Sequence, residues 1–237
     1  MEYANWHAAT FLSRPNRFIA HCQLEGREVI AHVKNTGRCK ELLVPGCQVF
    51  LQHTTSPHRK TQYDLYAVNK HGLLINMDSS APNQVFWEQA REDIGKVLPE
   101  FCRSQSSQMP LILKREVFFS HSRFDFFAAQ GEKQAYIEVK GVTLEQDGVV
   151  LFPDAPTARG EKHVYELIHA VEQGFLAYLV FMVQLSGAKY FTPNGKTHPS
   201  FAEALKKAQQ QGVHLLCYDC QVSANKMTFG KPLPIYL

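Results

Sequence analysis

The chain has 237 residues, of which 45% are hydrophobic and 20% charged, proportions typical of a soluble globular protein. No apolar run is long enough to span a membrane and the first residues lack a signal-peptide core, so we expect a cytoplasmic protein. The net charge of +3 lies in the first third: residues 1–80 carry nine Lys and Arg against six Asp and Glu, and residues 81–237 carry sixteen of each. This bias is compatible with a polyanionic partner but does not identify one.

The first eighty or so residues predict a small β-barrel. Short runs rich in β-branched and aromatic residues are separated by turn signals such as Glu25-Gly26 and Pro45-Gly46. The expected strands are 18–24, 27–33, 48–51, 63–68 and 73–76. Five short strands in about eighty residues suit an OB-fold. Residues 34–43 predict a turn leading into a short helix, with Gly37 supplying a positive φ.

The rest of the chain predicts a second domain. Ala81-Pro82-Asn83 marks the boundary, which divides the chain into 1–81 and 82–237. A helix follows, with Asn83 as its expected N-cap. The elements expected after it are strands at 112–119, 123–129 and 135–140, a helix at 163–173, a buried strand at 175–185, a helix at 199–211 and a strand at 213–218. This order of elements predicts an α/β domain built on a mixed sheet.

The six cysteines are scattered, which is not typical of a secreted disulfide scaffold. Cys217 and Cys220 have the spacing of a zinc-binding pair, but they lie in or beside the predicted strand 213–218. Residues three apart on a strand face opposite sides of the sheet. The two thiols are therefore not expected to bind one metal ion.

The most informative pattern is Asp125 followed, thirteen positions later, by Glu138-Val139-Lys140. Glu138 and Lys140 are two apart on a predicted strand, so they project from the same face. If Asp125 lies on the neighbouring strand, two carboxylates and one ammonium group converge. Hard oxygen ligands of this kind suit Mg²⁺ or Mn²⁺, and a lysine beside them can orient a water molecule. The pattern favours a metal-dependent phosphodiesterase site, although a solvated strand face with a surface ion pair would have the same sequence.

The chain resembles the sugar fermentation stimulation protein A (SfsA) family. The matching text, in the family's order, is Phe11-Leu12-x-Arg14-Pro15-Asn16-Arg17-Phe18, Asn35-Thr36-Gly37-Arg38, Ala81-Pro82-Asn83, Ser122-Arg123-Phe124-Asp125, Glu138-Val139-Lys140 and Phe152-Pro153-Asp154-Ala155-Pro156-Thr157-x-Arg159-Gly160-x-Lys162-His163. These strings span nearly the whole chain, and the last is the most specific.

The resemblance implies an N-terminal OB-like barrel, a C-terminal mixed sheet with flanking helices of the PD-(D/E)xK restriction-endonuclease type, and nucleic-acid binding. By match to the nuclease motif, Asp125, Glu138 and Lys140 become the candidate catalytic centre, with Asp125 and Glu138 as ligands of Mg²⁺ or Mn²⁺. Phe124 stands where that motif has proline. The proline supplies no ligand, so its absence weakens the match more than the chemistry.

Further acidic candidates lie in the second domain. A helical glutamate often completes the acidic site in the nuclease superfamily, which makes Glu88 a candidate, although Glu88 could equally be a solvated helix residue. Glu116 is a weaker candidate for the same role.

Cationic candidates occur in both domains. Arg159, Lys162 and His163 lie near a helix start, where backbone N–H groups and cations favour a phosphate. The alternative is a structural loop in which Asp154 pairs with Arg159. On the barrel, basic side chains could track a nucleic-acid backbone while aromatic residues stack on bases, or could be plain surface charges. These basic residues are Arg14, Arg17, Arg38, Arg59 and Lys60.

Two hypotheses follow. The first is a metal-dependent nuclease acting on DNA. The second is a DNA-binding regulator of sugar (maltose) utilisation genes that keeps the nuclease fold without turnover. Two acids near phosphates favour the first, because without a cation they would repel the DNA. The sequence leaves open the strand form of the nucleic acid and the oligomeric state, for which a homodimer is one option.

Overall fold

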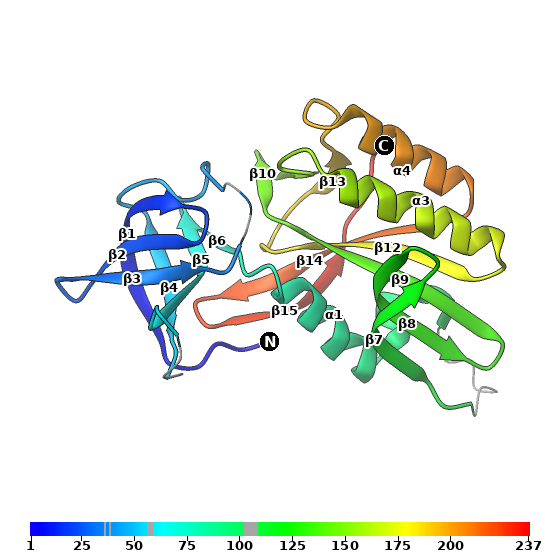
Figure 1. Ribbon diagram of the computed structural model, residues 1–237, viewed down its shortest axis with the longest axis horizontal. Coiled ribbons are helices and arrows are strands. Elements are labelled where there is room, and N and C mark those ends of the chain that lie inside the picture. Colours follow the sequence, from blue (N-terminus) through cyan, green and yellow to red (C-terminus); the bar gives the residue numbers. More distant parts are fainter. Residues whose placement is uncertain (36, 38, 56–58, 102–108) are drawn as a thin grey trace.

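The computed structural model describes residues 1–35, 37, 39–55, 59–101 and 109–237, which form a barrel joined to a sheet flanked by helices (Figure 1). The strands are β1 (Trp6–Asn16), β2 (Ile19–Leu24), β3 (Arg27–Val33), β4 (Gln48–His53), β5 (Tyr63–Lys70), β6 (Leu73–Asn76), β7 (Ile112–Phe119), β8 (Ser122–Gln130), β9 (Lys133–Val142), β10 (Leu144–Gln146), β11 (Val149–Phe152), β12 (Leu176–Val183), β13 (Tyr190–Pro193), β14 (His214–Ser223) and β15 (Lys226–Pro232). The helices are α1 (Ala81–Glu92), α2 (Ile94–Val97), the 3₁₀ turn η1 (Pro99–Phe101), α3 (Ala158–Glu172) and α4 (Pro199–Gln210).

Strands β1 to β5 close into a barrel. The sheet order is β3-β2-β1-β4-β5-β6, and an additional parallel pairing of β3 with β5 closes the ring. The sequence did not predict β1, because Ala8, Ala9 and Pro15 weaken its β pattern. The strand expected at 73–76 exists as β6, but it lies outside the ring, where it pairs with β5 and forms a bridge between Ile75 and Leu185.

The segment between β3 and β4 differs from the prediction of a short helix. Its described residues, Gly37 among them, form bends and turns. A glycine is needed there for space: a Cβ atom would lie 2.9 Å from Asn35 Oδ1 and 2.9 Å from Asp154 Oδ2. Gly37 is therefore a point of close approach between the barrel and the segment that precedes α3.

The second sheet is mixed, as predicted. Its order is β15-β14-β12-β9-β8-β7, with β12 parallel to both β9 and β14 and the other pairs antiparallel. One face is covered by α1, and the other by α3 and α4, which pack against each other (Figure 1). Strands β10, β11 and β13 form a small separate sheet that the sequence did not predict.

Two helix starts differ from those predicted. The N-cap of α1 is Ser80, not Asn83, and Ser80 makes no side-chain capping bond. Helix α3 begins at Ala158, five residues earlier than expected, because Thr157 Oγ1 accepts a hydrogen bond from the Gly160 N–H at 3.1 Å. Arg159 and Lys162 consequently lie inside the helix.

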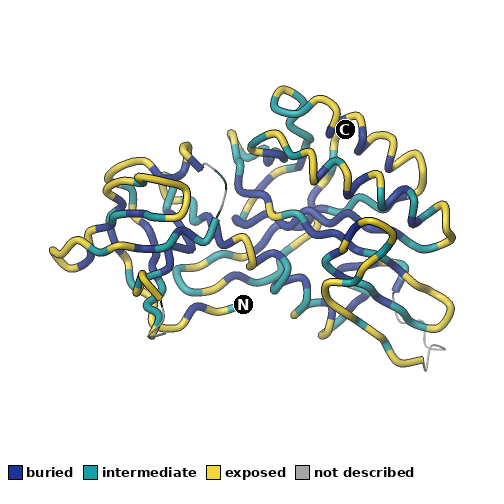
Figure 2. Tube along the Cα trace, viewed as in Figure 1, coloured by how far each residue is buried: buried dark blue, intermediate teal, exposed yellow. Residues whose placement is uncertain are grey.

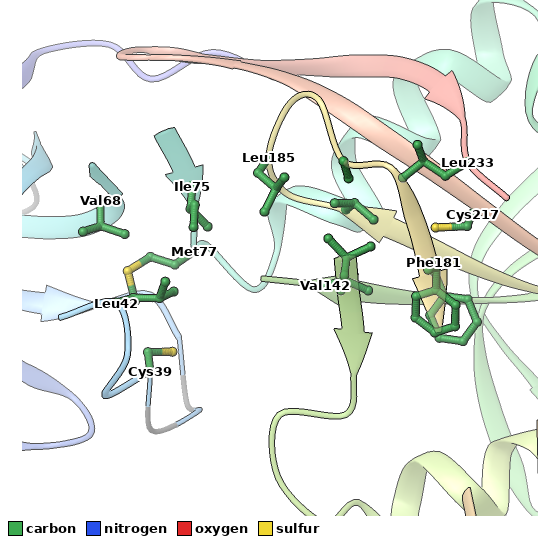
Figure 3. Close-up of a cluster of buried hydrophobic side chains, with 14 of the residues drawn as sticks. Cys39, Leu42, Val68, Ile75, Met77, Val142, Phe181, Leu185, Cys217 and Leu233 are labelled. Carbon is green, nitrogen blue, oxygen red and sulfur yellow. The ribbon is translucent and has the colours of Figure 1, made fainter. Parts of the chain in front are cut away.

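The hydrophobic core does not stop at the domain boundary. One continuous cluster runs from the barrel, through Ile75 and Met77, to Val142 and Leu185 (Figure 3). The same cluster includes the apolar residues of α3 and α4. A second cluster lies between the sheet and α1. Buried residues accordingly line both the inside of the barrel and the central strands of the sheet (Figure 2).

The two cysteines of the C-x-x-C spacing lie on β14 in different cores. Cys217 belongs to the cluster shared with the barrel, and Cys220 belongs to the cluster under α1. The prediction that the two thiols face opposite sides of the sheet is confirmed. No helix in the described ranges is long and apolar enough to cross a membrane.

A buried polar network also joins the barrel to the sheet. The carboxylate of Asp78 is fully buried; it receives Lys34 Nζ at 2.7 Å and the Tyr3 hydroxyl at 3.1 Å. Tyr3 stacks on Tyr66 of β5, with ring centroids 3.8 Å apart. Gln184, which follows β12, donates to the backbone carbonyl of Asp78 at 3.0 Å. The connection is therefore held by specific contacts rather than by a loose linker.

Candidate active site

The sheet opens between β8 and β9. Their antiparallel ladder ends at the pair Phe126–Ile137, while β8 goes on pairing with β7 and β9 goes on pairing with β12. Asp125 and Glu138 are the first residues beyond the last pair. The sequence pattern therefore places both acids at the point where two strands of one sheet separate.

Asp125 bridges this opening. Its Oδ2 atom accepts the backbone N–H of Val139 at 2.8 Å, in place of a ladder hydrogen bond. Its Oδ1 atom accepts the side-chain amide of Asn83, on the first turn of α1, at 2.7 Å. The expected neighbourhood of Asp125 and the β9 motif is thus present, and α1 contributes an amide rather than an acid.

Glu138 is almost fully buried, with 3% of its surface exposed. Its Oε1 atom accepts hydrogen bonds from Lys140 Nζ, at 2.5 Å, and from His163 Nδ1 on α3. Its Oε2 atom is buried and has no hydrogen-bond partner among the described residues. A buried carboxylate oxygen without a partner is costly, and it is an available ligand for a cation.

The pKa values of the two acids are shifted in opposite directions. Burial and the nearby charge of Glu138 raise the pKa of Asp125 to about 6. For Glu138, burial alone would raise the pKa, but the hydrogen bond from His163 and the charge of Lys140 outweigh burial and lower it. At neutral pH both groups are ionised, and Asp125 is the one closer to taking up a proton.

The start of α3 approaches the site from the other side. His163 is buried and contacts Glu138, and Arg159 Nε lies 3.5 Å from His163 Nε2. Arginine can only donate, so His163 is assigned as the tautomer with its proton on Nδ1. Lys162 points elsewhere, since its Nζ donates to the carbonyl of His121 at 3.1 Å. Among the described residues, Asp154 and Arg159 form no ion pair, so the structure does not show the loop-pairing alternative.

The structure does not bring Glu88 or Glu116 into the site. The carboxylate of Glu88 pairs with the N-terminal ammonium group of Met1 at 2.5 Å and accepts from Gln84. Glu116 forms an exposed ion pair with Arg123 at 2.8 Å. Neither glutamate therefore completes the acidic pair.

The basic residues of the barrel divide into two groups. Arg14 donates to three backbone carbonyls, and Arg59 pairs with the buried carboxylate of Asp64, so both have structural partners. Arg17 and Lys60 are exposed. Arg38 lies outside the described residues.

Asn83 and the contact between His163 and Glu138 were not foreseen from the sequence. Asn83 and His163 occur in two of the strings that carry the resemblance to the SfsA family, Ala81-Pro82-Asn83 and the segment ending in His163, and that resemblance was the available signal. Across the described ranges, no group of three or more His, Cys, Asp or Glu side chains is arranged to hold a metal ion. A cation here would therefore need water, backbone or substrate oxygens in addition to Asp125 and Glu138.

Comparison with known families gives two matches that together cover most of the chain. Residues 12–77 match the SfsA N-terminal OB domain, and residues 81–226 match the sugar fermentation stimulation protein RE domain. Among related sequences, a sugar fermentation stimulation protein homolog of Desulfitobacterium hafniense (strain Y51) is 50% identical over 230 residues, covering 97% of this chain and 96% of the relative. A homolog from Clostridium beijerinckii is 43% identical over 237 residues and is covered in full.

A solved structure has the same fold. The structure of Pyrococcus furiosus SfsA in complex with Ca²⁺ superposes with a TM-score of 0.86 at 27% identity, covering 100% of this chain and 98% of that protein. The predicted fold, an N-terminal OB barrel followed by a mixed sheet with flanking helices, is confirmed.

Proposed function

The chain belongs to the sugar fermentation stimulation protein family, and from that premise and the geometry of the site we propose that it is a DNA-binding, divalent-metal-dependent nuclease. The observation that carries the proposal is the opening between β8 and β9, where Asp125 and the unpartnered Oε2 atom of Glu138 lie beside Lys140. An isolated binding surface for phosphates would gain nothing from two buried acids.

The residues at the opening fit a hard divalent cation. A buried carboxylate oxygen lacks a donor, and the pKa of its neighbour Asp125 is raised by burial and by the charge of Glu138, so positive charge is in deficit there. Mg²⁺ is commonly held by one or two carboxylates together with waters and substrate phosphates, which agrees with the absence of a third ligating side chain among the described residues. The related Pyrococcus furiosus protein was solved with Ca²⁺, another cation that prefers oxygen ligands.

Each residue at the opening has a role in this proposal. A bound Mg²⁺ or Mn²⁺ would polarise the scissile phosphate and acidify the attacking water. Asp125 and Glu138 would hold the cation, while Asn83 and the N–H of Val139 fix the Asp125 carboxylate. Lys140 would orient the water and balance negative charge in the transition state.

Helix α3 supplies the remaining residues of the proposed site. His163 holds Glu138 Oε1 so that Oε2 is left for the cation. Arg159, in the first turn of α3, would bind a phosphate together with the positive end of the helix dipole. Lys162 donates to a backbone carbonyl, so we expect it to contribute less than Arg159 to phosphate binding.

The test is cleavage of end-labelled single- and double-stranded DNA with Mg²⁺, Mn²⁺ or EDTA. We expect metal-dependent cutting by the wild type and a loss of at least about 100-fold in Glu138→Ala and Lys140→Ala. Glu116→Gln is the matched control, because it changes an exposed carboxylate on the same sheet outside the opening.

The outcomes separate the hypotheses. Tight binding without cutting under any condition would make the protein a DNA-binding regulator on a nuclease scaffold. Cutting that survives in Glu138→Ala would mean a contaminant or a different catalytic centre.

A further inference from the structure

The barrel contains a cavity of about 480 Å³ beside the second half of β1. This volume lies in the range of small-molecule sites. The cavity is lined by β1 and by residues between β3 and β4, and none of its lining residues comes from β2 or β3. OB barrels usually bind oligonucleotides on the face of their second and third strands. The cavity therefore lies apart from that usual surface.

The lining of the cavity combines an apolar floor with a cationic rim. Phe11, Cys39 and Leu43 form the floor and are almost fully buried, with 2%, 2% and 7% of their surfaces exposed. Arg17 and Lys40 stand at the rim and are exposed. Among the described residues, the ion pairs of the barrel involve other side chains, so Arg17 and Lys40 can pair with an anionic ligand.

A flat aromatic surface adjoins the rim. The ring of Phe18 is 45% exposed, and the guanidinium of Arg17 lies 5.1 Å from its centroid. A ligand that matches these features has a planar, largely apolar part for the floor and an anionic part for the rim. A nucleoside phosphate has both, because its base can lie on apolar side chains while its phosphate contacts Arg or Lys.

A series of contacts runs from the cavity to β9, the strand that carries Glu138 and Lys140. Arg14 lines the cavity and donates to the carbonyls of Asn35 and Gly37, each at 3.1 Å. Asn35 and Gly37 in turn line a second, polar cavity of about 260 Å³ together with Gly141. Gly141 directly follows Lys140 on β9, so the second cavity reaches the strand that carries the candidate catalytic residues.

We propose that the barrel cavity receives one nucleotide of a single-stranded nucleic acid whose following residues pass over Asn35 and Gly37 to Lys140. The proposal rests on the proposed nuclease function and names the form of its substrate. In a duplex each base is stacked and paired, so it cannot enter the cavity, whereas an unpaired strand presents its bases freely. The barrel then selects single strands and sets the distance between the nucleotide bound in the cavity and the phosphodiester bond that is cleaved.

The test measures binding of a 5′-labelled oligothymidylate by fluorescence anisotropy in EDTA, where cleavage is stopped. Ser13→Leu places an apolar side chain at an exposed strand position that lines the cavity, without touching the core. We expect it to weaken single-strand binding by about 10-fold or more while duplex binding is unchanged. Gln23→Leu adds the same side chain at an exposed position of β2, outside this cavity, and should bind nucleic acid like the wild type.

A second pair of variants tests the rim. Arg17→Ala combined with Lys40→Ala should lower the slope of log affinity against log salt by about 1.4, the value for two lost phosphate contacts on a single strand. Arg27→Ala removes another exposed cation of the barrel, outside the cavity, and should leave the slope unchanged.

Several results would overturn the proposal. Normal single-strand binding by Ser13→Leu would do so, as would an equal loss for single strand and duplex. Competition by free thymidine monophosphate at concentrations similar to those of the oligonucleotide would show that the cavity takes a free nucleotide instead of a strand. If the wild type binds no nucleic acid at all, the proposed function fails first.

Discussion

Asp125 and Glu138 are neighbouring carboxylates in different chemical settings. Glu138 contacts Lys140 and His163, whereas Asp125 accepts hydrogen bonds, among the described residues, from two neutral donors, the side-chain amide of Asn83 and the backbone N–H of Val139. Burial and the charge of Glu138 therefore raise the pKa of Asp125 to about 6. A proton and a metal ion then compete for the same carboxylate, and we expect metal affinity to fall as the pH drops through about 6.

The raised pKa of Asp125 predicts a stability change in Asp125→Asn. The folded protein binds this proton more tightly than the unfolded chain does, so the associated stability is fully present below about pH 4 and is lost as the pH rises through 6. The metal-free variant should therefore be more stable than the metal-free wild type at pH 8, by about 1–3 kcal/mol, and similar at pH 4.5. Urea unfolding in EDTA at the two pH values measures the difference.

Added Mg²⁺ extends this test. It should stabilise the wild type at pH 8 by mass action and should stabilise Asp125→Asn much less. A metal-free variant that is less stable than the wild type at pH 8 would mean that the hydrogen bonds from Asn83 and Val139 outweigh the cost of the buried charge.

At the scale of elements, β9 approaches the start of α1 at Gly141. A Cβ atom there would lie 2.5 Å from Gln184 Oε1 and 2.8 Å from Pro82 Cγ. Gly141→Ala should therefore destabilise the protein by about 1–3 kcal/mol, as overpacking usually does. Gly195→Ala is the matched control: its nearest neighbour is Ala202 Cβ at 3.8 Å, so its midpoint of thermal unfolding should stay close to that of the wild type. Equal unfolding midpoints for the two variants would contradict the close approach.

The cap of α3 gives another prediction at this scale. Thr157 Oγ1 accepts the Gly160 N–H, so Thr157→Ala should cost about 1 kcal/mol and Thr157→Ser should cost little. Since α3 carries Arg159 and His163, the alanine variant should also lose the proposed nuclease activity, and serine should restore it. Chemical unfolding and the cleavage assay measure the two effects, and loss of stability without loss of activity would show that the cap does not position the site.

The sequence predicted strands most reliably where their period was clear. The limits of β7 were predicted as observed, and the two-residue spacing of Glu138 and Lys140 placed them correctly on β9. β1 was missed because its alanines and proline hide the strand pattern. The sheet of β10, β11 and β13 was missed because two of its strands have four residues and one has three, too few to show a period.

Contacts between elements could not be predicted from local patterns. Asn83 and Glu88 lie five residues apart on α1, which turns their side chains about 140° from each other, so both cannot face Asp125. Which of them does depends on how α1 packs on the sheet. In the same way, the contact of His163 with Glu138 depends on α3 starting five residues earlier than its apolar stripe indicated.

At the scale of the whole molecule, the barrel and the sheet share one hydrophobic cluster and the buried network around Asp78. We therefore expect the chain to unfold in a single transition. The two tryptophans report this directly, because Trp6 lies in the barrel and Trp87 lies on α1. Single-tryptophan variants, Trp6→Phe and Trp87→Phe, should show the same urea midpoint.

Breaking the junction should lower both midpoints together. Asp78→Ala leaves Lys34 without its buried partner and should destabilise the protein by about 3–5 kcal/mol. Glu28→Ala, which removes the exposed partner of His21, is the control and should have little effect. Two separate transitions, with only one of them shifted by Asp78→Ala, would show that the barrel and the sheet fold independently.

Cys217 and Cys220 lie on opposite faces of the sheet, so the accessibility of each thiol reports on a different layer of the protein. Each thiol is closed off by a different layer, Cys217 by the side that carries α3 and α4 and Cys220 by the side that carries α1. A thiol reagent reacts with either one only after the layer above it has opened. In variants that keep one of these cysteines and replace the others, the rate of thiol modification would measure how readily one face of the sheet is exposed. The ratio of the two rates would show which of the two layers opens more readily.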